Sequence, residues 1–336
     1  MRPDPRHGVL LPRLWWHVLV TCLLVAATSV VAQDLADLCG CARDGTLKGF
    51  NAGDPATYPA GTTGCAAACQ SGAIVLPMPA DGVLRFSNFS AQGAFTISFK
   101  PNSTNTPLTL LVSGDVVLRA PSCCGTLVVA GHAGDAATPA RGVGAGGIGG
   151  PGAFRGGRGH SQPLGVGGLT PGGNGEGPGG GWGATTNVEA LGGTFTGTPE
   201  LQPLLGGSGG GGGSGFGFEP SCLGGGGGGG GGAILIKANG RIALQNFQVV
   251  ADGGPGGQPA DRSCSQGGAG GSGGAIRLVA RSFSGMGAAR LTAKGGEPAH
   301  RGGVATAGRI RLESVDNSSA TTFATEPSAS RVVVKQ

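Results

Sequence analysis

Cysteine is the residue type in this sequence with the most evident chemistry. Eight cysteines follow Ala32, where an export signal is expected to end: Cys39, Cys41, Cys65, Cys69, Cys123, Cys124, Cys222 and Cys264. An even number of cysteines in an exported chain predicts disulfides. Two cysteines two residues apart share a face of a strand, and two cysteines four residues apart share a face of a helix.

The four cysteines nearest the N-terminus have complementary spacings. Three alanines separate Cys65 from Cys69 and Gly72 follows, a pattern that predicts a short helical turn ending at the glycine. We therefore expect Cys39 and Cys41 to pair with Cys65 and Cys69, in an order that the spacing leaves open. A zinc site of four thiolates is the alternative, and export disfavours it because oxidising compartments favour disulfides.

Cys222 and Cys264 occupy equivalent places before two glycine runs. The interval between them equals the interval between the two clearest repeat units. In a stack of repeats they lie one above the other on adjacent turns, so we expect them to bond. The alternative is that each pairs with Cys123 or Cys124.

Four charged residues are candidates for catalysis. A polysaccharide lyase or hydrolase on a parallel β-helix needs clustered carboxylates, or a basic group with a bound metal, on one face. Asp115, Asp252, Glu297 and Arg301 are the candidates in this sequence. Aspartate beside glycine is also ordinary turn chemistry, which accounts for the aspartates without catalysis. Matches to the dinucleotide-binding pattern G-x-G-x-x-G are expected by chance in such a glycine-rich chain, so they do not indicate a cofactor. We expect a non-catalytic protein with no cofactor.

Histidines offer no metal site by their spacing. His132, His160 and His300 lie far apart in glycine-rich stretches, and no two of them have the spacing of metal ligands. We expect solvated loop histidines and no metal.

The N-terminal segment 1–32 has the pattern of an export signal. Arg2, Arg6 and Arg13 form a positive region, an apolar stretch over 14–31 follows, and small residues precede a cleavage point after Ala32. A membrane anchor is the alternative, because about 18 apolar residues is the lower limit for a spanning helix. We favour cleavage, and expect a protein that is secreted or at the cell surface, without a membrane span after cleavage.

Charge excludes one large class of partner. The formal net charge of the whole chain is +5, and the Lys and Arg residues are scattered along it. A nucleic-acid-binding surface requires a concentrated basic patch, so nucleic acid is not an expected partner.

The elements that must position these residues are short strands separated by glycine. Glycine accounts for 74 of 336 residues, about three times its average usage, and aromatic residues are few. Consecutive strands with turn residues between them are expected from Ala73 onwards, among them Val83–Phe86 and Leu108–Val112. The predicted organisation is a signal peptide (1–32), a cysteine-containing N-terminal cap (33–72), a β-strand region (73–135), a glycine-rich low-complexity insertion (136–232), β repeat units (233–315) and a C-terminal tail with room for a last strand (316–336).

The glycine-rich insertion has two interpretations. Flexible coil is favoured, because glycine loses the most backbone entropy on ordering. The alternative is a set of extended left-handed strands that pack closely because no β-carbon intervenes. No strict three-residue glycine period supports that alternative.

Repeats in the last third predict the fold class. The run GGAILIKA begins at Gly231, GGAIRLVA begins at Gly273, and AGRIRLE begins at Ala307; A-x-G-G follows a second strand in the first two units. A fainter copy lies over 115–131. Such units bury an apolar face only by stacking. We expect an all-β protein, a parallel β-helix-like β-solenoid with two strands per unit and long glycine-rich loops, with an antiparallel β-sandwich as the alternative.

These repeats resemble the glycine-rich, β-solenoid-like repeats of many exported proteins from microbes, algae and plants. The resemblance covers roughly 225–313 and implies a secreted or surface-associated scaffold, with no shared catalytic residues. The polyglycine runs are also similar to the glycine-rich ectodomain region of certain receptor kinases, although this chain has no kinase segment. We expect a structural or adhesive protein whose partners are extracellular matrix, cell-wall polysaccharide or surface proteins; a carbohydrate-binding or polysaccharide-degrading β-helix is the alternative.

Three sequons are present, at Asn88, Asn102 and Asn317. In a eukaryotic source they would carry N-linked glycans on loops.

Overall fold

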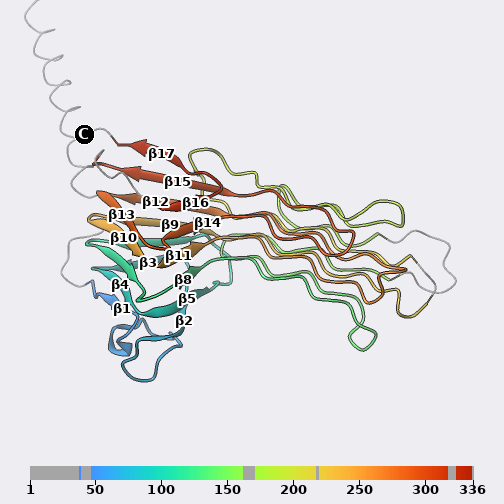
Figure 1. Cartoon of the computed structure of the whole chain (residues 1–336), viewed down its shortest axis with the longest axis horizontal. Helices are drawn as coiled ribbons and strands as arrows, with labels where there is room; N and C mark the ends of the chain where they lie inside the picture. The colour runs from blue at the N-terminus through green and yellow to red at the C-terminus, as the bar shows by residue number, and fades with distance from the viewer. Residues whose placement is uncertain (1–37, 39–46, 162–170, 217–218, 317–322, 335–336) are drawn as a thin grey trace, which may run out of the picture.

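The fold consists of three parallel β-sheets and a lobe of glycine-rich connections (Figure 1). It is seen in a computed structural model, which describes residue 38 and residues 47–161, 171–216, 219–316 and 323–334. The predicted signal peptide, Cys39 and Cys41 lie outside the described residues. The sheets occupy one end of the molecule in Figure 1, and the glycine-rich connections extend from them.

Every sheet is assembled from strands that are distant in sequence. Sheet A contains, in spatial order, β1 (Phe50–Asn51), β4 (Phe89–Gln92), β7 (Val116–Arg119), β10 (Arg241–Gln245) and β13 (Ser282–Met286). Sheet B contains β16 (Ala324–Glu326), β14 (Arg290–Thr292), β11 (Phe247–Val250), β8 (Gly125–Val128), β5 (Ala94–Lys100) and β2 (Ser71–Pro77). Sheet C contains β17 (Ser330–Val333), β15 (Arg309–Ser314), β12 (Ala275–Ala280), β9 (Ala233–Ala238), β6 (Leu108–Val112) and β3 (Val83–Phe86).

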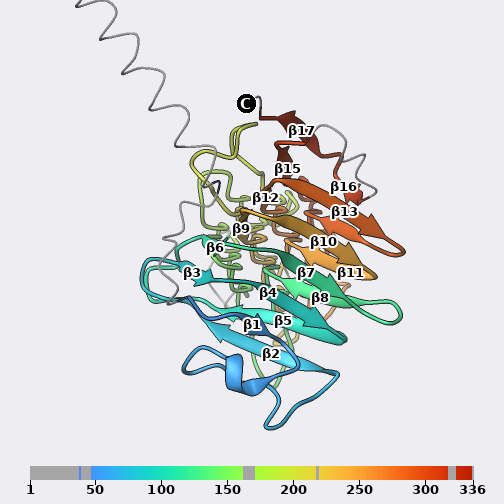
Figure 2. The ribbon, with the colours of Figure 1, turned by 90° about the vertical axis from the view of Figure 1, so that its left-hand side faces the viewer.

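The chain visits the three sheets in turn. From β1 to β15 it passes from sheet A to sheet B to sheet C and back to sheet A, so each complete turn of the chain adds one strand to every sheet. All the pairs between these strands are parallel, which excludes the antiparallel sandwich. The all-β prediction is confirmed, and the three parallel sheets are compatible with a β-solenoid (Figure 2).

The registers follow the spacing of the repeats. Ala233 in β9 pairs with Ala275 in β12, the equivalent alanine of the next repeat unit, and Ala275 pairs with Arg309 in β15. The expected two-strand unit is wrong, because β10 and β13 add a third strand between those recognised in the sequence. The fainter copy over 115–131 equated β7 with β9 as the first strand of a unit. β7 instead pairs with β10, because both belong to sheet A.

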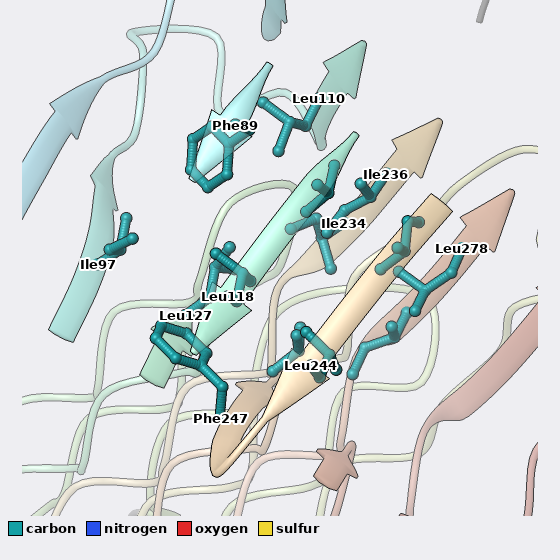
Figure 3. Close-up of a cluster of buried hydrophobic side chains, with 14 of the residues drawn as sticks. Phe89, Ile97, Leu110, Leu118, Leu127, Ile234, Ile236, Leu244, Phe247 and Leu278 are labelled. Atoms are coloured by element: carbon teal, nitrogen blue, oxygen red, sulfur yellow. The ribbon is translucent and has the colours of Figure 1, made fainter. Parts of the chain in front are cut away.

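Alternation within the strands builds one continuous core between the sheets. In sheet B the inward positions stack as Ile97, Leu127, Val249 and Leu291, all at most 1% exposed. Sheets A and C contribute similar rows, which meet the first row in Figure 3. A β-carbon on Gly125 would lie against the Phe247 ring, so glycine is required where that ring fills the core. Burial of these rows supplies the hydrophobic free energy that holds the sheets together.

The N-terminal cap closes one end of this core. Phe50 stacks on Phe89 with 4.6 Å between ring centroids, and Tyr58 stacks on Phe50 at 5.7 Å. The cap contains a short 3₁₀ helix, Pro55–Thr57, with Asp54 as its N-cap. The helical turn predicted between Cys65 and Gly72 is absent, because Gly72 already belongs to β2 and pairs with Phe95.

Candidate functional site

Three long connections leave sheet B and return to sheet C at the same corner of the fold. They link β8 to β9 (129–232), β11 to β12 (251–274) and β14 to β15 (293–308). Because successive turns of the chain are stacked, the three connections run side by side away from the sheets (Figure 1). We call them together the glycine lobe.

The segment 224–232, which consists entirely of glycine, shows how the lobe is held. Its amide groups donate to three neighbouring segments in strict rotation. Gly225 donates to Gln266, Gly226 to Asp135 and Gly227 to Gly157, and the cycle then repeats through Gly232, with N–O distances of 2.7–3.1 Å. A donor direction that recurs every third residue indicates three residues per turn, as in the extended polyproline-II-type helix.

The carbonyl groups of 224–232 accept hydrogen bonds from three further segments. Gly144, Gly147 and Gly150 donate from one of them, Gly213, Gly210 and Gly207 from another, and Gly257 and Gly254 from the third. Three segments on the donor side and three on the acceptor side surround this segment completely. The segments 206–215 and 265–274 have the same arrangement.

Complete enclosure explains the composition of these three segments. A β-carbon on Gly226 would overlap the carbonyl oxygen of Ala145, and one on Gly227 would overlap that of Gly210. No larger side chain fits where backbones approach this closely. The enclosed segments therefore consist mainly of glycine, with a few small residues such as Ser208 and Ser272. The amide of Ser208 donates to the hydroxyl of Ser272 at 2.9 Å.

Segments at the surface of the lobe carry larger side chains at every third position. In 251–260 these are Asp252, Pro255 and Gln258, with buried or half-buried glycine between them. In 153–160 they are Arg155 and Arg158, with Gly156 and Gly157 buried between them. The spacing follows from three residues per turn, which corresponds to about 9 Å along the axis. The lobe therefore presents side chains in fixed ranks.

The favoured prediction of flexible coil is wrong for the described part of the insertion. Glycine has a high entropic cost of ordering, but here each enclosed residue gains backbone hydrogen bonds to neighbouring segments. The sequence of an enclosed segment shows no three-residue period, because close neighbours on all three sides of its helix favour glycine at nearly every position.

A groove crosses the surface of the lobe over four adjacent segments. It has a volume of about 570 Å³, and the charged residues that line it are Asp135, Arg141, Arg155, Arg158 and Glu176. Its base contains the backbone of Gly146, Gly156 and Gly157. Sequence analysis missed this groove, although the three-residue spacing of two arginines was a signal for it.

The guanidinium groups of the groove are short of partners. Arg155 uses its Nε to donate to the Gly146 carbonyl at 3.2 Å. Within the described residues, no ion pair joins Arg141, Arg155 or Arg158 to a carboxylate. Each arginine has five N–H donors, so most of these donors have no acceptor in the part of the chain that the structure describes.

Three exposed apolar side chains of the lobe lie outside the lining of the groove. Trp182, Leu191 and Val304 are 69%, 49% and 79% exposed. They lie on adjacent segments, because the Leu191 amide donates to the Trp182 carbonyl and a β-carbon on Gly192 would meet the Val304 carbonyl.

The disulfides tie the lobe and the cap locally. Cys222 bonds to Cys264, with 5.3 Å between their Cα atoms, at the starts of two enclosed segments. Cys65 bonds to Cys69, so the expected pairing with Cys39 and Cys41 is wrong for these two residues. The loop that replaces the predicted helix brings Cys65 and Cys69 within 6.3 Å, which permits a local bond.

Cys123 and Cys124 form a disulfide between neighbours in sequence. They are thus not partners for Cys222 or Cys264. Gln248 lies against this disulfide, with its amide nitrogen 3.3 Å from the Cys124 sulfur.

The four candidate catalytic residues do not form one site. Asp115 lies at the corner between β6 and β7 and pairs with Arg241 at 3.1 Å. Asp252 and Glu297 lie on neighbouring segments of the lobe, since Gly256 donates to the Glu297 carbonyl. Burial raises the pKa of Asp252, although its carboxylate accepts from the Lys294 amide at 2.8 Å. Arg301 lies over the Phe216 ring, 5.7 Å from its centroid.

A charged cluster joins the lobe to the outer face of sheet C. Glu313 accepts from Arg277 and Arg311, with N–O distances of 2.7 Å to each Nε. Burial acts to raise the pKa of Glu313, but the two guanidinium groups outweigh it and hold that pKa below its ordinary value. Arg311 also donates to the carbonyl of Pro199, which lies in the lobe.

Two predicted solvated histidines are half-buried. Nδ1 of His160 and Nε2 of His300 are enclosed, and neither has a hydrogen-bond partner among the residues that the structure describes. Among the described residues, no group of three or more His, Cys, Asp or Glu side chains could hold a metal ion.

The sequons differ in their surroundings. Asn88 is exposed, and its side-chain oxygen accepts from the Asp115 amide at 3.1 Å. Asn102 uses its amide nitrogen to donate to Pro79, Ala80 and Thr106, at 2.7–3.2 Å. Asn317 lies outside the described residues.

The fold and the lobe define an all-β protein of three parallel sheets that carries a hydrogen-bonded array of polyglycine segments. No helix in the described ranges is long and apolar enough to cross a membrane. Comparison with protein-family models, curated proteins and solved structures gives no match to this chain.

Proposed function

We propose that this chain is a non-catalytic extracellular scaffold protein with an adhesive role. The stacked sheets form a β-solenoid base, and the glycine lobe is a rigid element that displays side chains to matrix or cell-surface material. The observation that carries the proposal is the enclosure of 206–215, 224–232 and 265–274 by hydrogen-bonded neighbours. A glycine tract that is fixed in this way holds its surface residues in place, which is what a display element requires.

Support for an extracellular location comes from the disulfides and the predicted export signal. Cys65–Cys69, Cys123–Cys124 and Cys222–Cys264 are bonded. Disulfides persist in oxidising compartments and are rare in the cytosol.

Support for a non-catalytic role comes from the placement of the acidic residues. Asp115 is neutralised by Arg241 at one corner of the sheets, whereas Asp252 and Glu297 lie in the lobe at another corner. Glycosidic bond cleavage uses two carboxyl groups that flank the bond, within about 10 Å of each other. For Asp115, an ion pair with Arg241 takes the place of such a carboxyl partner.

The test is retention of the secreted protein on insoluble extracellular matrix or cell-wall material from its source organism. We expect the wild-type protein to be retained, and to release no reducing ends or unsaturated sugars from that material. Retention should fall when the lobe is disrupted by Gly228→Val, with Gly49→Ala as a control in the cap. Passage of the folded wild-type protein without retention, or release of sugar products, would overturn the proposal.

A further inference from the structure

We propose that the arginine-lined groove of the glycine lobe binds a segment of an acidic polysaccharide. The inference rests on the proposed adhesive function and names the ligand class for it. The groove is lined by Arg141, Arg155 and Arg158, together with Asp135 and Glu176.

The positions of the arginines are fixed by the lattice beneath them. Arg155 and Arg158 are one turn apart on the same segment, because Gly156 and Gly157 between them are buried against other segments. The Gly156 amide donates to Gly147 and the Gly157 amide donates to Gly210, at 2.9 and 2.8 Å. The two guanidinium groups therefore leave the surface on the same side, from Cα atoms about 9 Å apart along the axis.

Arg141 is fixed from a separate turn. Its amide donates to the carbonyl and the hydroxyl of Thr138, both at 3.1 Å, in the turn that joins the segments beginning at 129 and 143. The three cations thus converge on one groove from two different parts of the lobe.

The arginines of the groove have the chemistry of an anion-binding site. Arg155, Arg158 and Arg141 have no carboxylate partner in the described chain, and arginine forms paired hydrogen bonds to planar or tetrahedral oxyanions. Cations without a protein counter-ion at fixed positions favour an anionic ligand. Because three arginines line the same groove, a ligand with repeated charges is favoured over a single small anion.

The two carboxylates of the groove restrict the kinds of anionic ligand that fit it. Asp135 and Glu176 would repel a ligand that carries only negative charge, but carboxylates accept hydrogen bonds from hydroxyl groups. A chain with carboxylate or sulfate groups and hydroxyl groups in alternation satisfies both kinds of residue. The backbone of Gly146 and Gly156 lines the groove between the charged side chains.

The test measures binding of the full secreted chain to three soluble polymers: polygalacturonate, dextran sulfate and uncharged dextran. We expect binding to at least one charged polymer, weaker binding as salt is added, and no binding to dextran. Preference between the first two polymers distinguishes a carboxylate ligand from a sulfate ligand.

Variants locate the binding in the groove. We expect Arg141→Glu with Arg158→Glu to weaken binding at least about tenfold, since each hydrogen bond to a charged group contributes about 1.5–3 kcal/mol. Arg119→Glu with Arg281→Glu is the matched control, because it makes the same change of charge and both residues are exposed outside the groove. Its effect should stay within about twofold, and both proteins should keep the unfolding midpoint of the wild type.

The outcomes separate this inference from the proposed function. Equal weakening by the groove variant and by the matched control variant would show a non-specific charge effect and overturn the groove assignment. Absence of binding to all three polymers would overturn it as well. If the wild type and the groove variant are retained equally on native matrix, the adhesive function stands while the groove assignment fails.

Discussion

Gly228 lies so close to Gly254 that a β-carbon on Gly228 would overlap the Gly254 carbonyl oxygen. The backbone nitrogen of Gly271 blocks the same position, so no side-chain rotation relieves the contact. This relationship, repeated throughout the enclosed segments, makes glycine a packing requirement of the lobe and provides its most direct test.

Replacing Gly228 with alanine should destabilise the lobe. Overpacking of a close-packed interior costs about 1–3 kcal/mol or more, and we expect the upper end because both obstacles are backbone. The control is Gly49→Ala, where the new β-carbon would meet the Ser87 hydroxyl at an ordinary 3.5 Å. Urea unfolding and amide hydrogen exchange of the two variants make the comparison, and a lobe with wild-type protection in Gly228→Ala would contradict the enclosed lattice.

Removing the Cys222–Cys264 disulfide should lower the stability of the lobe. The bond closes a loop of 42 residues, for which the chain-entropy estimate is about 4 kcal/mol. Replacement of both cysteines by serine avoids a free thiol. The matched control replaces Cys65 and Cys69, which close a loop of only four residues and should cost less. Non-reducing peptide mapping checks the pairings first, and a link from Cys222 to Cys123 or Cys124 would refute them.

Glu313 should determine part of the acid stability. Its pKa is depressed by Arg277 and Arg311 despite its burial, so the native state releases this proton more readily than the unfolded chain. The stabilisation is complete above the ordinary glutamate pKa and is lost as pH falls through the depressed value. We expect Glu313→Gln to cost about 3 kcal/mol at neutral pH, with a smaller loss of stability on acidification. Unfolding midpoints measured from pH 7 to pH 2 test this, and parallel curves for both proteins would count against it.

Asp252 should make the stability of the protein depend on pH in the opposite direction. Burial raises its pKa, so the native state holds this proton more tightly than the unfolded chain. Stability therefore falls as pH rises from the ordinary aspartate pKa through the raised value. We expect Asp252→Asn to be at least as stable as the wild type at pH 7, because asparagine can still accept from the Lys294 amide. If the difference in stability between pH 4 and pH 7 is the same for the variant as for the wild type, another group is responsible.

The strands were largely predictable because their apolar residues alternate. The expected strands at Val83–Phe86 and Leu108–Val112 coincide with β3 and β6. The period of the repeats predicted the pairing of β9 with β12, and it placed Cys222 opposite Cys264. These inferences need only local pattern and spacing.

Other features depended on contacts that the sequence does not reveal. β10 and β13 were missed as a third strand of each turn, because their residues Arg241–Gln245 and Ser282–Met286 resemble ordinary linkers in a two-strand unit. The arginine-lined groove joins Arg141 to Arg155 and Arg158 only after four lobe segments lie side by side.

By itself, the sequence determined an all-β class, the approximate strand positions and the period of the last repeats, since alternation and spacing act over a few residues. Only the tertiary structure decided that the glycine runs are ordered. A single polyglycine segment has no internal hydrogen bonds and no side chains to bury, so nothing in its own residues favours order. The segment 224–232 is ordered because six neighbouring segments, several of them distant in the chain, satisfy its backbone on all sides.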